Sequence, residues 1–278
     1  MTLADERIRN EGAAAAHGSI ILAETQTGGI GRRGRSWLSP PTGNLYFSLL
    51  WAPLVAVTAG GTSAVADGAP SPAMLLPHLS QLNLAASVAV VKAAADVGIA
   101  TAKIKWPNDV WASATPMSRP KKMSGTILNF DGKEGAVLGV GINVLQDLAV
   151  NETATSLSSL REQISPPEAR PPAVTREAVL AAFCYEIERL MALPTEAVLD
   201  EYRKYDLLRG NTIRVHHKTR EEDDPNDFDA EAVGVSADGM LRVRPKAGGP
   251  ERMLSGEEVS ISPMMLAGLE EDAQCEMK

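Results

Sequence analysis

Hydrophobic and polar positions divide the chain into two parts with different patterns. In the first part, continuous apolar runs over residues 18–23 and 44–51 predict buried strands. From about residue 77 to 97, apolar residues recur at helical spacing, and Gly98 stands where a helix C-terminal cap belongs. Residues 55–73 are rich in Ala, Gly, Ser and Pro, which is typical of a surface loop.

The middle of the chain continues this mixture of strands and helices. A strand is expected over residues 102–111, where Pro107 interrupts it. The other elements predicted here are a strand pair at 122–130 and 136–143 with a turn at 131–133, a Pro-rich linker at 165–172, and helices at 175–191 and 194–205.

After residue 208 the pattern changes to short strands separated by charged or glycine-containing turns. The strands are expected at residues 211–215, 229–235, 240–245 and 252–254. Such a run suits a small β-barrel of about 55 residues. We therefore expect one domain over residues 1–207, a second over 208–263, and a tail over 264–278.

Composition restricts the classes of function. The 278 residues carry a formal net charge of −8, which argues against a sequence-independent grip on nucleic acid. No DNA-binding helical segment is recognised, so no repressor activity is expected. No apolar run reaches membrane-spanning length, and the start is not a secretory signal. Cys184 and Cys275 match no metal spacing, and we expect a reducing compartment, the cytoplasm, with an organelle as the alternative.

The segment 28–37 holds the most distinctive chemistry, because Arg32, Arg33 and Arg35 stand among four glycines. Arginine forks bind phosphate and carboxylate oxygens, and glycines let backbone N–H groups approach such anions. This predicts an anionic ligand, such as a nucleotide or an acyl phosphate. A solvated basic turn is the weaker alternative. The spacing also matches the dinucleotide fingerprint, but the residues after Gly34 do not begin a helix, which disfavours that interpretation.

Three further motifs gain weight beside this segment. Asn108 and Asp109 could hold a Mg²⁺–phosphate group, although Pro-Asn-Asp is also a common turn. Lys122 precedes the small pair Ser124-Gly125 in an expected strand and could direct its charge at a ligand above that glycine. The glycines of Gly139-Val140-Gly141-Ile142-Asn143 indicate close packing against the backbone. The pair His216-His217 stands beside acidic residues, which makes a metal site conceivable, but a solvated hairpin is favoured and no role is assigned.

Together these segments resemble the biotin protein ligase family, in its monofunctional form without a DNA-binding domain. The motifs that carry the resemblance, in order over about residues 15–160, are Ala23 to Trp37, Ser39-Pro40, Gly43 to Ser48, Lys105 to Asp109, Lys122 to Leu128, Gly139 to Val144 and Ala154 to Leu157. The resemblance implies an α+β fold. Its parts would be a class II synthetase-like catalytic domain, a mixed sheet with helices, and a small SH3-like C-terminal β-barrel.

The resemblance also implies ATP- and Mg²⁺-dependent chemistry in two steps. The carboxylate of biotin attacks the α-phosphate of ATP to give biotinyl-5′-AMP and pyrophosphate. A lysine amine of a biotin carboxyl carrier domain then attacks the mixed anhydride. The partners implied are therefore biotin, ATP and the carrier domains of biotin-dependent carboxylases, with no nucleic acid, no membrane, and a homodimer as an open alternative.

Roles for individual residues follow from the resemblance. Gln26 and the Gly29 backbone would hold biotin, and Gly125 would give its rings room. Asn143 would lie at the phosphate end of the nucleotide. The implied catalytic residues are Lys122, Arg32 and Arg35; the implied binding residues are Gln26, Gly29, Gly31, Trp37, Asn108, Asp109, Gly125, Gly141 and Asn143; and Asp109 is the implied metal ligand.

Two alternatives remain at this point. The family's Ser-Thr-Asn segment, which binds the ureido group of biotin, is not found around Thr2 to Asp5. A non-catalytic or truncated member that binds biotin, nucleotide or a carrier domain would fit that departure. A lipoate ligase fits less well, because its Arg-Arg-x-Ser-Gly-Gly-Gly loop and its His-Asp pair are missing.

Overall fold

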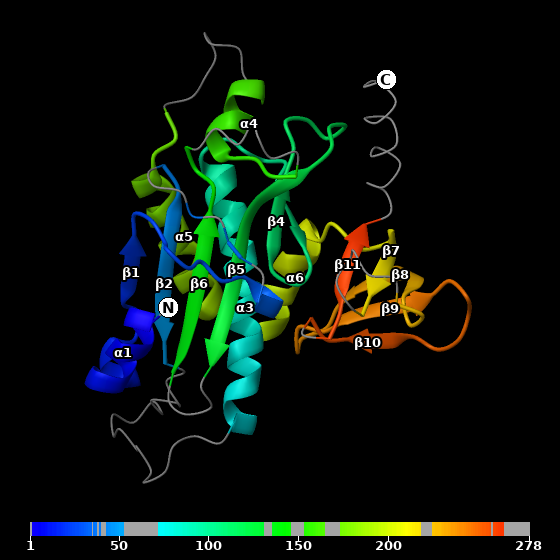
Figure 1. The fold of residues 1–278 in the computed structure, drawn as a ribbon, viewed down its shortest axis with the longest axis horizontal. Coiled ribbons are helices and arrows are strands. Elements are labelled where there is room, and N and C mark those ends of the chain that lie inside the picture. The colour runs from blue at the N-terminus through cyan, green and yellow to red at the C-terminus, as the bar shows by residue number, and fades with distance from the viewer. Residues whose placement is uncertain are drawn as a thin grey trace.

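The computed structural model describes residues 2–34, 36–37, 39, 43–52, 72–130, 135–145, 153–164, 173–217, 224–256 and 258–263. These residues form two antiparallel sheets that lie side by side, with helices packed on the larger one (Figure 1). The predicted α+β class is confirmed at this level. The helices are α1 (Thr2–Glu11), α2 (Ala13–Ala16), η1 (Arg32–Gly34), α3 (Pro72–Asp96), α4 (Leu157–Ile164), α5 (Arg176–Met191) and α6 (Thr195–Tyr205).

The larger sheet has six strands in the order β1-β2-β6-β5-β4-β3. Its strands are β1 (Ile20–Ala23), β2 (Leu45–Trp51), β3 (Lys103–Lys105), β4 (Asp109–Ala112), β5 (Lys121–Phe130) and β6 (Ala136–Ile142). Each neighbouring pair of described strands runs antiparallel. The expected mixed sheet is therefore wrong for these pairs, since among the described residues parallel contacts occur only as isolated bridges such as Ile104 to Asp206.

One face of this sheet is covered by α3, α5 and α6, which lie behind it in Figure 1. The ring of Phe47 on β2 meets that of Phe183 on α5 edge-on, with centroids 5.0 Å apart. Residues of β2 from Leu45 to Leu50 are buried whichever way they point. Burial on both faces is the reason that the strand reads as a continuous apolar run rather than as an alternation.

Several elements were not predicted, and each offers a weak pattern. Helix α1 contributes little apolar surface, chiefly Ala4 and the partly buried Ile8, which pack with Ala16 and Leu50. Helix α4 spans only two turns, and strand β11 is four residues long. Short elements give the periodicity argument too few positions to work with.

The C-terminal sheet has five strands in the order β10-β9-β8-β7-β11. They are β7 (Thr212–His216), β8 (Phe228–Val235), β9 (Leu241–Pro245), β10 (Arg252–Leu254) and β11 (Ser260–Pro263). Strand β9 alternates strictly between buried and exposed residues, as a sheet with one covered face requires. Within the described residues β10 and β11 are the two edges, and no pairing between them closes a barrel.

Some predicted segments lie outside the described residues. These are the loop of residues 55–73 up to position 71, the turn at 131–133, the linker at 165–172 and the tail at 264–278. In the described part of the chain, no helix has the length and apolarity needed to cross a membrane.

Candidate active site

The Gly/Arg segment, residues 28–37, folds back on itself above the larger sheet. Ile30 and Ser36 form an antiparallel bridge, and the Trp37 N–H donates to the Gly29 carbonyl at 2.8 Å. Between them, η1 makes the turn. Arg33 sits there at φ 58° and ψ 34°, a left-handed conformation that costs a branched or long side chain free energy.

Gly29 is placed where no side chain fits. A Cβ at this position would lie 2.8 Å from Gln26 Oε1 and 3.0 Å from Ser39 Oγ. The Ser39 hydroxyl donates to that same Gln26 oxygen at 2.9 Å. The absence of a Cβ therefore lets the segment pack directly on the Gln26 amide, and Ser39 fixes how the amide is turned.

The indole of Trp37 covers two glycines of the sheet, Gly125 on β5 and Gly141 on β6, which face each other in register. A Cβ on Gly141 would lie 2.7 Å from the indole, and one on Gly125 would lie 3.0 Å from it. The indole nitrogen has no hydrogen-bond partner among the described residues. The Trp37 indole therefore lies against the space above Gly125, where room for a ligand was expected, and a ligand bound there would contact this ring.

Lys122 and Asp109 form the charged centre of the site. Their Nζ and Oδ1 atoms are 2.6 Å apart. The same ammonium lies 4.9 Å from the centroid of the Trp37 ring. Both side chains remain partly exposed, at 32% and 20%, so a ligand can reach them. A lysine held in this way offers a positive charge at a fixed point, which suits the stabilisation of developing negative charge.

Asn108 joins this centre to the Gly/Arg segment. Its side-chain oxygen accepts from Arg32 Nη1 at 3.4 Å, and its amide nitrogen donates to the Thr126 carbonyl. The peptide bond before Pro107, next to Asn108, is cis. Arg32 is thereby directed at Asn108, the residue immediately before β4.

These side chains surround a cleft of about 240 Å³. Ten predicted residues line it: Gln26, Gly29, Gly31, Arg32, Trp37, Asn108, Asp109, Lys122, Gly125 and Gly141. Arg35 lies outside the described residues. Asn143 is not among the lining residues. It is buried, and its side chain donates to the Thr155 carbonyl at 3.1 Å.

Sequence reasoning assigned no role to four polar residues that line the cleft, which are Ser36, Tyr46, Ser48 and Thr126. Tyr46 on β2 faces Gly141, and its hydroxyl accepts from Asn44 at 3.0 Å. Burial raises the pKa of the Tyr46 phenol above its ordinary value. The Thr126 hydroxyl is buried without a partner among the described residues. Tyr46 and Thr126 both belong to quoted motifs, but only the strand register reveals which side of the sheet they occupy.

The donor set restricts how a metal ion could be held. No group of three or more His, Cys, Asp or Glu side chains close enough for a metal occurs in the described part of the chain. The cleft instead offers the Asp109 carboxylate beside the Asn108 amide. A single carboxylate fits Mg²⁺ bound mainly through substrate phosphates and water.

A model of the biotin/lipoate A/B protein ligase family matches residues 1–147, and the chain belongs to this family. The resemblance inferred from the motifs is thereby confirmed. The glycine-lined cleft with its cation centre is consistent with the anionic ligands that the motifs predict.

Individual relatives agree with that assignment. The biotin–[acetyl-CoA-carboxylase] ligase of Mycobacterium tuberculosis is 34% identical over 163 residues, which are 57% of this chain and 52% of the relative. The bifunctional ligase/repressor BirA of Escherichia coli is 29% identical over 131 residues, 46% of this chain and 33% of BirA. The chain thus matches between a third and about half of the length of these relatives.

The fold is also similar to that of a solved structure. The biotin protein ligase of Aquifex aeolicus in complex with biotin and ATP aligns with a TM-score of 0.62 at 23% identity, over 93% of this chain and 94% of that one. At this level of identity the similarity establishes the fold alone.

Proposed function

We propose that the protein is an ATP-dependent biotin protein ligase. In the first step the biotin carboxylate attacks the α-phosphorus of ATP, the bond to the β-phosphate breaks, and biotinyl-5′-AMP and pyrophosphate form. In the second step a carrier-domain lysine amine attacks the acyl carbon. The amine loses a proton, the acyl–oxygen bond breaks, and AMP leaves.

The observation that carries this proposal is the ammonium of Lys122. It stands between the Asp109 carboxylate and the Trp37 ring, at the edge of a cleft floored by glycines. Adenylation brings a carboxylate against a polyphosphate, so a fixed cation between the two anions lowers the barrier. In our assignment Lys122 bridges the biotin carboxylate and the α-phosphate and stabilises the charge that develops there.

The other residues would hold the reactants and exclude water. Gln26 and the Gly29 backbone line the cleft and would hold biotin, while Asn108 would face the nucleotide. Arg32 would cover the adenylate as part of the Gly/Arg segment. A mixed anhydride hydrolyses if water reaches it, so a covering segment prolongs its life.

Mg²⁺ would be held by Asp109 together with the phosphates of ATP. The ion would neutralise phosphate charge when bound. The proposed Arg35–phosphate contact and the proposed place of Asn143 at the phosphate end extend the same assignment. For Asn143 the hydrogen bond to the Thr155 carbonyl favours a supporting position behind the cleft instead.

The assignment also divides the chain. We propose that residues 1–207 form the ligase domain and residues 208–263 an SH3-like C-terminal domain. Support for the division comes from the two separate sheets, whose strands do not mix along the sequence. The carrier domains of biotin-dependent carboxylases are the proposed protein substrates.

The test is incorporation of labelled biotin into a purified carboxyl carrier domain with ATP and Mg²⁺. Lys122→Ala should lower adenylate formation by roughly 100-fold or more, as removal of a preorganised charge does elsewhere. Lys121→Ala is the matched control, since Lys121 precedes Lys122 on β5 and does not line the cleft. It should keep nearly full activity.

Two outcomes would contradict the proposal. Transfer of lipoate but not biotin under the same conditions would assign the chain to the other branch of its family. Turnover of the folded Lys122→Ala variant close to that of the Lys121→Ala control would refute the role of the Lys122 ammonium. Circular dichroism and thermal unfolding of both variants establish that each is folded.

A further inference from the structure

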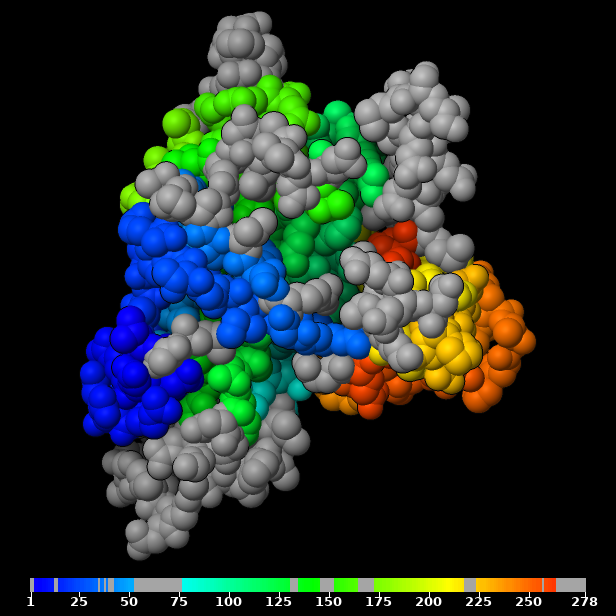
Figure 2. Space-filling view, in the orientation of Figure 1, coloured from blue at the N-terminus to red at the C-terminus, as the bar shows by residue number. Residues whose placement is uncertain are grey.

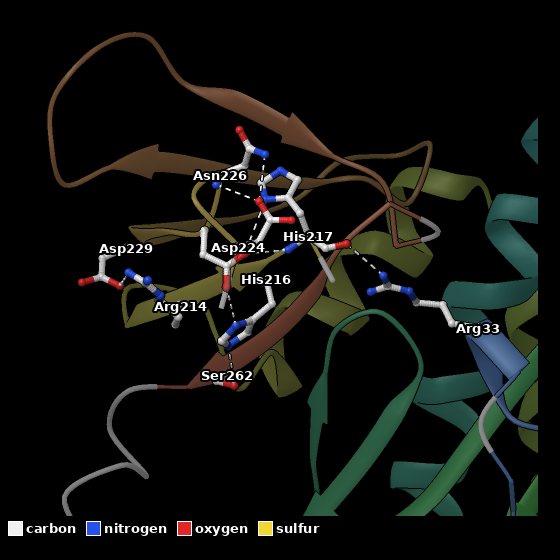
Figure 3. A network of polar contacts seen from close by, with 9 residues as sticks. Arg33, Arg214, His216, His217, Asp224, Asn226, Asp229 and Ser262 are labelled. Atoms are coloured by element: carbon white, nitrogen blue, oxygen red, sulfur yellow. Dashed lines mark hydrogen bonds and ion pairs between the residues drawn. The ribbon is translucent and has the colours of Figure 1, made fainter. Parts of the chain in front are cut away.

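The Gly/Arg segment, which lines the cleft, also touches the C-terminal sheet. Arg33 Nη2 donates to the His217 carbonyl at 3.0 Å, and Figure 3 shows the Arg33 side chain reaching over to the end of β7. In the space-filling view the blue N-terminal segment runs across the larger sheet towards the yellow C-terminal one (Figure 2). A segment that borders the cleft is therefore held partly by another sheet.

Arg32, the neighbour of Arg33, also contacts the C-terminal region. A Cβ on Gly256, in the connection between β10 and β11, would lie 2.5 Å from Arg32 Nη2 and 3.1 Å from the guanidinium carbon. The Arg32 guanidinium therefore packs against the Gly256 backbone through Nη2, while Arg32 Nη1 donates to Asn108. Gly256 is called the seat of Arg32 in this sense. The glycine has no left-handed backbone requirement, so close approach is the reason that a side chain is excluded here.

The conformation of Arg33 supports a positioning role. It is the sole non-glycine residue with positive φ in the described part of the chain. Glycine would adopt this turn without strain, and backbone strain persists only where the surroundings hold it. The arginine side chain supplies what glycine lacks, which is a donor long enough to reach the His217 carbonyl.

The acceptor of this bond is itself fixed by a polar network. Asp227 Oδ1 accepts from the His217 N–H at 2.9 Å, and its Oδ2 lies 3.0 Å from His216 Nδ1. The other nitrogen of the His216 ring lies 3.0 Å from the Ser262 hydroxyl on β11 (Figure 3). The carbonyl that receives Arg33 is thus tied to two neighbouring strands rather than to a free loop end.

A second set of contacts links the C-terminal sheet to the segment just before Asn108 and to α3. Trp106 Nε1 donates to the Gly239 carbonyl at 2.9 Å, and Ser80 Oγ donates to the Asp238 carbonyl at 3.2 Å. Trp106 is buried and lies two positions before Asn108. The turn between β8 and β9 therefore fixes the chain that carries Asn108 and Asp109.

We propose that the C-terminal sheet positions the Gly/Arg segment over the cleft, with Arg33 and Gly256 as positioning residues. Arg33 ties the segment to the His217 carbonyl, and Gly256 provides the seat that aims Arg32 at Asn108. The catalytic consequence rests on the proposed ligase function. With the segment released, Trp37 and Arg32 lose their positions, and the acyl-adenylate escapes before transfer.

The test compares the full chain with Gly256→Ala, Arg33→Ala, Arg33→Lys and the control Lys246→Ala. Lys246 is exposed on the turn after β9. Hydrogen exchange of the amides in residues 28–37, without ligand, reports the position of the segment independently of catalysis. Dissociation of preformed biotinyl-5′-AMP reports the consequence for the reaction, together with transfer to a carrier domain.

We expect Gly256→Ala and Arg33→Ala to exchange these amides about 3- to 10-fold faster than the unmodified chain, as loss of one modest hydrogen bond allows. Arg33→Lys, which keeps a donor, should recover part of the protection, and Lys246→Ala should match the unmodified chain. The two destabilised variants should also release the adenylate faster by a similar factor.

Unchanged exchange in Gly256→Ala and Arg33→Ala would overturn the proposal, and so would equal acceleration in Lys246→Ala. Faster exchange without faster release of the adenylate would overturn its catalytic part. Failure of the ligase assignment gives a different result, since the unmodified chain would then form no adenylate while the exchange differences persisted.

Discussion

Gly125 and Gly141 of the six-stranded sheet and Gly248 of the C-terminal sheet lie in different surroundings, and so do the charged pairs of the two sheets. In the six-stranded sheet, Gly125 and Gly141 stand inside strands with the Trp37 ring against them, and the charges of Lys122 and Asp109 face a cleft. In the C-terminal sheet, glycines such as Gly248 take left-handed turns in open space. Gly125 and Gly141 are thus explained by the close approach of the Trp37 ring, and Gly248 by its backbone conformation.

The charges of the C-terminal sheet behave differently too. Arg242 and Arg244 on β9 pair with Glu251 at 3.3 and 2.9 Å, all on the exposed face. Exposed pairs of this kind contribute little to stability. These pairs make the outer face of the C-terminal sheet polar, whereas the side chains of Lys122 and Asp109 line the cleft.

Among substitutions that test the difference between the two sheets, Gly141→Ala is expected to have the largest effect, a loss of biotin affinity. The added methyl group would lie 2.7 Å from the Trp37 indole, so either the ring or β6 must move. Overpacking of this kind costs about 1–3 kcal/mol, which corresponds to roughly a 5- to 150-fold loss of ligand affinity if the ring moves. Isothermal titration with biotin measures the loss.

Gly248→Ala is the matched substitution in the other sheet. Gly248 has φ 91° and nothing within 4 Å of an added Cβ. The variant should lose about 1–2 kcal/mol of folding free energy through backbone strain and bind biotin normally. Reduced biotin affinity in Gly248→Ala, or normal affinity in Gly141→Ala, would break the distinction between the two kinds of glycine.

A smaller effect is expected where the sheets meet. Trp106→Phe removes the donor to the Gly239 carbonyl while it keeps most of the buried aromatic surface. The free energy of unfolding should fall by about 1 kcal/mol or slightly more, because one partly buried hydrogen bond is lost and a smaller ring fills the site. Urea denaturation measures it, with Trp51→Phe as control on the partly buried end of β2.

If the Trp106 contact couples the sheets, the Trp106→Phe variant should also lose cooperativity. The transition followed by a probe on the C-terminal sheet should then precede that of the six-stranded sheet. Coincident transitions with an unchanged midpoint would show that the contact does not join them.

The smallest effect is expected from Asp227→Asn, and it depends on pH. Burial tends to raise the pKa of Asp227, but hydrogen bonds from the His217 N–H and the His216 ring outweigh it, and the pKa lies below its ordinary value. A lowered pKa stabilises the folded chain at pH values above the ordinary carboxyl pKa of about 3.9, and this stabilisation is lost as the pH falls through the folded value.

Asp227→Asn should therefore be less stable than the unmodified chain by about 1 kcal/mol at pH 7. The difference between the two should shrink on acidification. Thermal unfolding from pH 7 to pH 3 measures it. A difference that stays constant over this range would exclude the carboxylate charge as its cause.

Sequence patterns found most of the elements with long or regular signals. The apolar run of β2, the periodic helix α3 and the alternating strand β9 all lie close to where they were expected. Helix α1 escaped notice, because it buries little beyond Ala4 and Ile8. Antiparallel pairing in the larger sheet also escaped, since an apolar run does not reveal the direction of its neighbours.

For the site, the motifs of the sequence supplied most of the lining residues. The cleft is lined by residues 28–32, by Ser36 and Trp37, by Asn108 and Asp109, and by Lys122 and Gly125, all of which belong to these motifs. Asn143 differs from these residues. It belongs to a quoted motif, but it does not line the cleft, and its side-chain amide donates to the Thr155 carbonyl. Tyr46 enters the cleft through its register with Gly141, which no local pattern encodes.

The sequence by itself determined the family, the glycine and arginine chemistry and the approximate course of the strands, because these depend on residue types at short spacing. Only the tertiary structure decided that Trp37 lies on Gly125 and Gly141, that Lys122 pairs with Asp109, and that Arg33 reaches His217. Such contacts join residues separated by as many as 184 positions. They depend on register and packing over the whole fold, which local spacing does not contain.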